Sequence, residues 1–158
     1  MNYASLGEEF HFSSTLRAEY YDALEKLLFF NKKQPSFLEG IEKSIEQYGV
    51  PVIVADSVSL RIRTQLLDEV QNLFVFDGKT EGARLIGSVV YFRPTLSEMR
   101  IVHIAVDEDY VFGGKFADRS LTVQMIKKMK EIARKIKGIE LLSLEYRADF
   151  SIPIREKL

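Results

Sequence analysis

The chain has 158 residues, of which 46% are hydrophobic and 28% charged, and its formal net charge at pH 7 is -1. These values predict one soluble globular domain over residues 1–158, and the near-neutral charge argues against a nucleic-acid-binding protein. The chain has no cysteine and only two histidines. Disulfides, thiolate zinc sites, cysteine nucleophiles and histidine-rich metal sites are therefore excluded, and we predict no metal site.

The first residues, Met1 to Glu9, are polar and acidic. They lack the basic start and the apolar run of a signal peptide, and no later window is apolar enough to span a membrane. We therefore expect a cytoplasmic protein that does not associate with membranes.

Two helices are predicted in the first third of the chain. Ser14 or Thr15 can cap a helix that runs to about Phe30, with apolar residues along one face. A second helix begins at Ser36, and Glu39, three residues later, completes a capping box. Together they predict an N-terminal helix pair.

Strands are predicted where β-branched and aromatic residues gather. These runs are residues 10–12, 51–55, 58–63, 73–76, 85–92, 99–106 and 139–146. A compact turn at Pro94–Ser97 folds the run after it back antiparallel. Residues 73–106 thus predict a three-stranded antiparallel meander.

The clearest periodic signal predicts a helix from about Asp118 to Lys137. Its apolar stripe consists of Leu121, Met125, Met129, Ile132, Ala133 and Ile136. Gly138 ends the helix, and the last long strand follows. A strand, a helix and a further strand form a βαβ unit, and an anionic ligand can sit at the start of such a helix. The element order predicts an α+β domain with a mixed sheet.

Three segments between Leu73 and Tyr146 resemble the GNAT N-acetyltransferase superfamily. Leu85–Tyr91 resembles the family's third strand, with apolar residues on both sides of a glycine. Ile101–Tyr110 resembles the fourth strand and the Val-Asp-Pro-Glu-Tyr-like segment after it, and Glu131–Leu144 resembles the end of the CoA-side helix and the fifth strand. The resemblance implies a GNAT-like mixed central sheet with an N-terminal helix pair and one long helix after a Gly-Gly loop.

The resemblance also implies acetyl-CoA or another acyl-CoA as co-substrate. In the family, the fourth strand binds the pantetheine arm, and the loop after it surrounds the pyrophosphate. The residues implied for this role are Ile104, Val106, Val111, Gly113, Gly114, Lys115 and Arg119. Glycines allow the backbone to approach phosphate, and the helix N-terminus adds positive potential. The alternative is that Gly113-Gly114 forms an ordinary strand-to-helix turn.

Catalytic candidates follow from the same resemblance. The family commonly places a general base near the start of its fourth strand, where Arg100 cannot accept a proton. Glu98 shares the strand face of Arg100 by the period of two and is the predicted base; otherwise it is a solvated turn residue. Tyr146 could return a proton to the CoA thiolate, or it could be a packing residue. His103 is expected to be buried on the face opposite Arg100 rather than to act as a base.

The implied reaction is direct attack of an amine on the thioester, so the expected partner is a small-molecule or protein amine acceptor. The alternative is a non-catalytic domain of the same fold that binds a protein or a small ligand. Val111 and Phe116 favour this alternative, because the family has Arg or Gln and Gly or Ala there.

Only twelve residues follow Tyr146, and residues 150–154 suit one short edge strand. An apolar sheet edge left bare invites pairing with another chain. We therefore predict a homodimer in which the region after Tyr146 packs against the partner. The alternative is that residues 51–63 cover this edge within one chain.

Overall fold

A computed structural model of the chain describes residues 10–30, 46–78, 82–144 and 151–154. In chain order its main elements are β1 (Phe10–Ser13), β2 (Leu16–Arg17), α1 (Tyr21–Phe29), β3 (Pro51–Ala55), β4 (Ser59–Thr64), β5 (Gln71–Asp77), β6 (Arg84–Thr95), β7 (Glu98–Val106), α3 (Leu121–Arg134), β8 (Leu141–Leu144) and β9 (Ser151–Pro153). The helix predicted from Ser36 lies outside the described ranges, except for residues 46–48, which are helical. Short 3-10 helices lie before α1 and between β7 and α3.

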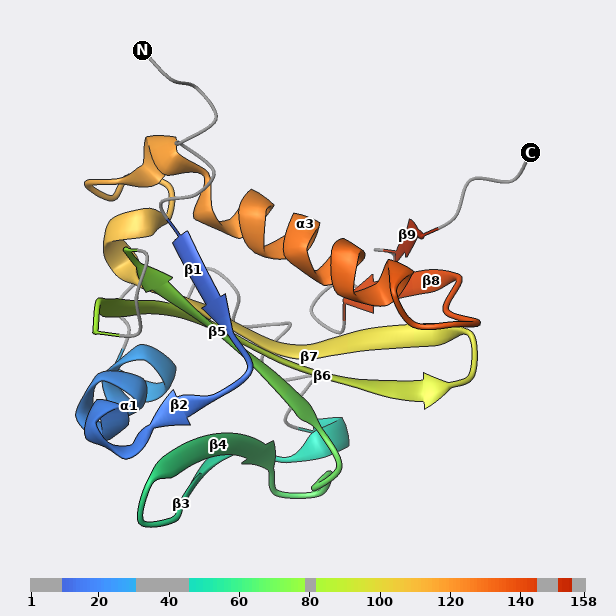
Figure 1. Cartoon of the computed structure of the whole chain (residues 1–158), viewed down its shortest axis with the longest axis horizontal. Helices are drawn as coiled ribbons and strands as arrows, with labels where there is room; N and C mark the ends of the chain where they lie inside the picture. The colour runs from blue at the N-terminus through green and yellow to red at the C-terminus, as the bar shows by residue number, and fades with distance from the viewer. Residues whose placement is uncertain (1–9, 31–45, 79–81, 145–150, 155–158) are drawn as a thin grey trace.

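Six strands form one curled mixed sheet in the order β1-β5-β6-β7-β8-β9 (Figure 1). Its pairs are antiparallel except β7 and β8, which run parallel and are joined through α3. The fold is therefore α+β with a mixed sheet, and the meander of β5, β6 and β7 confirms the prediction for residues 73–106. β6 runs three residues further than the predicted strand at residues 85–92 and ends at Thr95, so it includes Pro94.

The β6–β7 pair contains a register shift between Val90 and Tyr91. Val90 lies opposite His103 and Phe92 lies opposite Arg100. Because directly opposed residues in a sheet share a face, His103 and Arg100 point to the same side. The prediction that they lie on opposite faces was wrong, since a bulge adds one residue to a strand and breaks its period of two.

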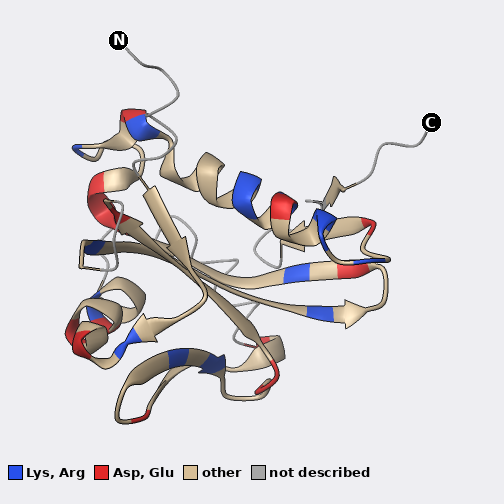
Figure 2. Ribbon diagram, viewed as in Figure 1, with Lys and Arg blue, Asp and Glu red and all other residues tan. Residues whose placement is uncertain are grey.

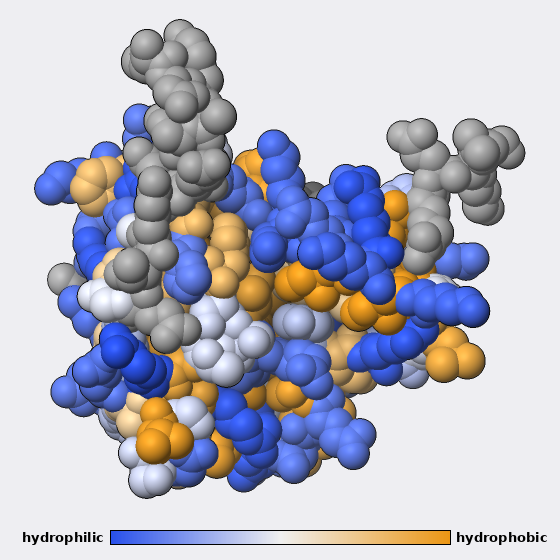
Figure 3. Space-filling view, viewed as in Figure 1, coloured by the Kyte–Doolittle hydropathy of each residue, from blue (hydrophilic) through white to orange (hydrophobic). Residues whose placement is uncertain are grey.

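One face of the sheet is covered by α3. Leu121, Met125, Met129 and Ala133 are buried there, whereas Ile132 and Ile136 are half-buried at the margin, so the apolar stripe is confirmed. Figure 3 shows apolar side chains along the border where α3 meets the sheet, beside a band of hydrophilic side chains on the helix. The helix is shorter than predicted, because residues 117–119 form a 3-10 turn and Ser120 takes a left-handed conformation with φ 54°.

The other face is covered by α1 and by a three-stranded sheet in the order β2-β4-β3 (Figure 1). Its core includes Leu24, Leu28, Ile62 and Phe74. The predicted helix start at Ser14 or Thr15 was wrong. Residues 16–17 pair with β4, and α1 begins only at Tyr21.

The far edge of β8 is covered within the chain by β9, which pairs with it antiparallel. The β3–β4 hairpin instead belongs to the second sheet, so residues 51–63 do not pair with β8. The position of β9 confirms the prediction of a short edge strand at residues 150–154. In the described ranges, no helix is long and apolar enough to cross a membrane.

Candidate functional site

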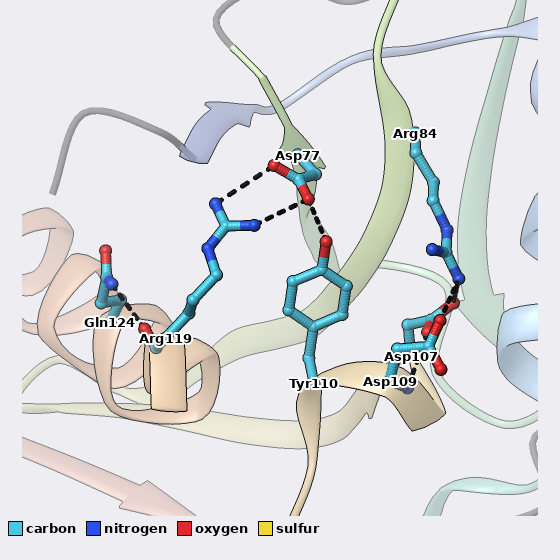
Figure 4. Close-up of polar contacts among 7 residues, drawn as sticks. All are labelled: Asp77, Arg84, Asp107, Asp109, Tyr110, Arg119 and Gln124. Carbon is cyan, nitrogen blue, oxygen red and sulfur yellow. Dashed lines mark hydrogen bonds and ion pairs between the residues drawn. The ribbon is translucent and has the colours of Figure 1, made fainter. Parts of the chain in front are cut away.

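The loop between β7 and α3 begins with an acidic 3-10 turn, η4 (Glu108–Tyr110), visible as a red segment in Figure 2. The carboxylate of Asp107 accepts a hydrogen bond from the backbone N–H of Asp109 at 2.9 Å. Arg84, at the start of β6, donates to Asp107 at 2.9 Å and to Asp109 at 3.1 Å (Figure 4). The Asp107 side chain therefore caps the turn, and the Arg84 guanidinium partly neutralises the two carboxylates that it contacts.

A second ion pair fixes the other end of this loop. The Nη1 and Nη2 atoms of Arg119 donate to the two carboxylate oxygens of Asp77 at 2.8 and 3.1 Å (Figure 4). The Tyr110 hydroxyl donates to the same carboxylate, and the Arg119 guanidinium lies 4.5 Å from the ring centroid of Phe10. Arg119 therefore ties β1, β5 and the loop together, a role that the sequence did not indicate.

These contacts shift the protonation equilibria of the cluster. The hydrogen bond from Arg119 is the main cause that lowers the pKa of Asp77. Burial, followed by the neighbouring Asp77 carboxylate, raises the pKa of Tyr110. At neutral pH the carboxylate is thus ionised and the phenol protonated, which are the states that their hydrogen bond requires.

The glycine loop itself is tightly packed. The backbone N–H of Gly114 donates to Val111 at 2.8 Å, and that of Phe116 donates to Asp109 at 2.6 Å. A Cβ placed on Gly114 would lie 2.4 Å from the carbonyl oxygen of Glu108. Gly114 is therefore required by the loop's own packing, and both of these amides already have acceptors within the loop.

Of the predicted loop cations, Lys115 differs from Arg119. Its ammonium lies 5.3 Å from the ring centroid of Phe116, and it forms no ion pair with any described residue. The helix α3 then starts at Leu121 without a side-chain cap from Ser120. The first amides of a helix have no partner within it, so an uncapped start retains donors for other groups.

The predicted pantetheine contacts, Ile104 and Val106, lie on β7 before this loop. They are paired with Val89 and Gly87 of β6, and their side chains are half-buried against the core under α3. Between the described parts of β7 and β8, pairing spans residues 98–101 and 141–144. Ile104 and Val106 therefore lie beyond that paired section, on the loop side.

A second polar cluster lies at the other end of β7. The Oε2 atom of Glu98 accepts from Nε and Nη2 of Arg100, both at 2.9 Å, and from the Ser143 hydroxyl at 2.6 Å. Nη1 of Arg100 donates to the Tyr48 hydroxyl at 2.9 Å. The Glu98 side chain is only 18% exposed, so it is not a solvated turn residue.

The two carboxylate oxygens of Glu98 therefore differ in their hydrogen bonding. Oε2 receives every hydrogen bond that Glu98 forms with described side chains, and Oε1 receives none. The spacing of Glu98 and Arg100 predicted their shared face. Ser143 and Tyr48 were missed, because they come from β8 and from residues 46–48, which the sequence does not connect with β7.

His103 is buried, as predicted, with 5% of its surface exposed. Burial lowers the pKa of its imidazole from 6.5 to about 4, so the ring is neutral at pH 7. On the same face of the sheet, the Ser88 hydroxyl is fully buried and has no hydrogen-bond partner among the described residues. Tyr146 lies outside the described residues. No group of three potential metal-binding acids or histidines occurs within the described ranges.

No protein-family model matches the sequence, and neither curated proteins nor solved structures gave a match. Within the structure, the predicted residues fall into two separate sites. The loop residues lie together before α3, and Glu98 lies at the opposite end of β7. Val106 lies eight residue steps along the strand from Glu98, a distance of roughly 26 Å.

Proposed function

We propose that this chain is a GNAT-like N-acyltransferase that moves an acetyl or another acyl group from acyl-CoA to an amine. The observation that carries the proposal is the order of elements around β7: an antiparallel meander, a loop, α3, and a strand parallel to β7. That order is the one expected from the family resemblance. This order of elements supports the proposal only through the fold. The catalytic chemistry is argued from the loop before α3 and from the cluster around Glu98.

An elongated ligand suits the spacing of these sites. The loop before α3 offers Lys115 and an uncapped helix start to phosphates, while Ile104 and Val106 lie between this loop and Glu98. A nucleotide with a long arm, such as acyl-CoA, can extend along β7 and bring its thioester towards Glu98. A compact ligand would reach only one end.

In the proposed reaction, the amine nitrogen attacks the thioester carbonyl and loses a proton as the new C–N bond forms. The Oε1 atom of Glu98 is the candidate acceptor, because Arg100 and Ser143 hold the carboxylate through Oε2. The C–S bond then breaks, and the CoA thiolate takes a proton from Tyr146 or from water. A positioned base of this kind contributes about 100-fold or more to the rate.

The second candidate is a non-catalytic domain of the same fold that binds a protein or a small ligand. It is favoured by the Arg119–Asp77 pair and by the bonding of the Gly114 and Phe116 amides within the loop. Both features reduce what the loop can offer to a pyrophosphate. The cytoplasmic location and the amine acceptor stay predictions.

Two measurements separate these candidates. Acetyl-CoA at millimolar concentration should raise the melting temperature, because a ligand that binds only the folded state stabilises it. Release of free CoA thiol in the presence of a panel of amines should fall about 100-fold in Glu98→Gln and remain unchanged in Glu140→Gln, a control at an exposed position. A melting shift without thiol release supports the binding domain. No shift at all contradicts acyltransfer.

A further inference from the structure

β3 lies at the border of the second sheet, whose strand order is β2-β4-β3 (Figure 1). Within the described residues, β3 pairs with β4 on one side and with no strand on the other. The edge strand of a sheet presents unpaired N–H and C=O groups that can bond a further strand. β3 is therefore a place where another chain can extend this sheet.

The register of the β3–β4 hairpin identifies the backbone groups at this edge. The N–H of Asp56, directly after β3, donates to the carbonyl oxygen of Ser59 at 3.0 Å. Because hydrogen-bonded pairs alternate along an antiparallel ladder, Val54 also bonds to β4, whereas Ile53 and Ala55 direct their N–H and C=O groups outwards. Neither Ile53 nor Ala55 forms another backbone hydrogen bond with a described residue. The edge therefore offers both donors and acceptors to an added strand.

The outer face of β3 carries a row of valines. Ile53 packs against the core beneath the sheet, so Val52 and Val54 point to the opposite face. Both are half-buried, and Val50, which continues the row just before β3, is 44% exposed. A strand added at this edge would cover apolar surface as well as form hydrogen bonds.

Arg61 and Arg63 of β4 lie on the same face, each directly opposite a valine of β3, and both are blue in Figure 2. Their guanidinium groups share one carboxylate, that of Asp68, at 3.1 and 3.7 Å. The Asp56 carboxylate accepts hydrogen bonds within its own turn. Exposed pairs such as those with Asp68 contribute little stability, so the arginines can exchange this partner for another carboxylate at low cost.

We propose that the outer edge of β3 binds an extended acidic segment of another protein as an additional strand. The segment bonds Ile53 and Ala55 through its backbone, and its glutamate side chains reach Arg61 and Arg63 across the valines. Two strand spacings, roughly 10 Å, separate the added strand from β4, a span that an arginine and a glutamate side chain cover together. A second copy of this chain fits less well, because its own β3 brings valines and further arginines. The inference does not depend on the proposed acyltransfer.

The probe is a short synthetic peptide in which valine and glutamate alternate, added to the full-length chain. One comparison peptide has lysine in place of glutamate, and another has proline at its central valine and cannot form a complete strand. Fluorescence anisotropy gives the dissociation constants, and NMR gives the exchange rates of single backbone amides. The glutamate peptide should bind at least about tenfold more tightly than either comparison peptide.

Amide exchange locates the peptide on the strand. In the chain without peptide, the Ile53 and Ala55 amides should exchange quickly, because they point outwards, and the glutamate peptide should slow both. The Val54 amide, which bonds to β4, should be protected with or without the peptide and serves as the internal control. A bound peptide that leaves the exchange of Ile53 and Ala55 unchanged overturns the inference.

The variants separate the backbone from the charges. Ala55→Pro removes an outward donor and should weaken the glutamate peptide about tenfold, whereas Ala55→Thr keeps the donor and should bind like the wild type. Arg61→Gln should weaken the same peptide severalfold and reduce the salt dependence of its binding, with Lys127→Gln on α3 as the unchanged control. Melting temperatures show whether Ala55→Pro folds; if it does not, amide exchange and Arg61→Gln decide.

Three results contradict the proposal. Equal affinity of the lysine and glutamate peptides shows that the edge does not select acidic segments. Unchanged affinity of a folded Ala55→Pro and of Arg61→Gln places the peptide elsewhere. If the wild type self-associates in sedimentation experiments and Ala55→Pro is monomeric, a second copy of the chain occupies the edge instead.

Discussion

At the scale of single residues, the neutral imidazole of His103 links stability to pH. Its pKa is lowered by burial from 6.5 to about 4 in the folded chain. The unfolded chain therefore binds a proton more readily, and the stability that depends on neutral His103 is fully present above about pH 6.5. It is lost progressively as the pH falls towards 4.

We predict that His103→Leu makes the free energy of unfolding less sensitive to acid. Between about pH 7 and about pH 5, the wild type should lose about 2 kcal/mol more than the variant, measured by urea unfolding. His11→Gln, at the half-buried second histidine in β1, is the control and should follow the wild type. Equal losses in the wild type and His103→Leu would show that His103 is not the titrating group.

Gly114 gives a second prediction at this scale. Gly114→Ala should lower the free energy of unfolding by about 2 kcal/mol or more, because its Cβ would meet the backbone of Glu108 and Asp109. Gly87→Ala should cost less, since the nearest atoms, at 3.0 Å and beyond, belong to the flexible Met125 side chain. Chemical denaturation of both variants checks this order. Because a Gly114 substitution is expected to destabilise the fold, it cannot test phosphate binding separately from folding.

At the scale of elements, the Asp77–Arg119 pair holds the loop before α3 against β5. Both side chains are mostly buried, with 28% and 21% exposed. A double-mutant cycle with Asp77→Asn and Arg119→Met should give a coupling energy of about 1–2 kcal/mol. The Arg17–Glu19 pair, 2.6 Å apart but with 52% and 62% of the side chains exposed, should give less than about 0.5 kcal/mol.

The same cycle has a predictable pH dependence. Because the pKa of Asp77 is lowered on folding, its contribution is present above the unfolded pKa, about 3.9, and is lost as the pH falls through the folded value. The coupling measured near pH 3 should therefore be smaller than at neutral pH. A coupling that is as large in acid would show that it does not depend on the ionised form of the Asp77 carboxylate.

Local patterns predicted those elements whose own residues determine them. The meander and the apolar stripe of α3 follow from periodicity and turn chemistry, and both are found. The pattern at Leu16 and Arg17 suited a helix, but pairing with β4 competes with helix formation and prevails. The face of His103 depends on a bulge, and the partners of Glu98 come from residues 48 and 143, so tertiary contacts decide both.

At the scale of the whole molecule, β9 forms one edge of the large sheet, where a second chain could pair. The predicted homodimer remains a proposal in which the region after Tyr146 packs against a partner. Sedimentation equilibrium of the full-length chain tests it directly. A chain that stays monomeric at high micromolar concentration would contradict the homodimer.

The backbone of β9 restricts hydrogen bonding between this sheet edge and a second chain. The N–H of Ile154 donates to Glu140 at 2.9 Å, so it points towards the interior of the sheet. Because backbone groups alternate along a strand, the nitrogen of Pro153 faces the outer edge, where it has no hydrogen to donate. A short edge strand with an outward proline resists backbone pairing with a second copy.

We therefore predict that Pro153→Thr increases self-association of the full-length chain. The substitution restores one donor on the outer edge of β9 and introduces a residue that favours strands. The sedimentation profile should shift to higher mass than that of the wild type at the same concentration. Thr122→Val, at an exposed position of α3, is the control for added apolar surface and should not shift. If Pro153→Thr sediments like the wild type, the missing donor does not protect this edge, and any homodimer would have to bury side chains instead.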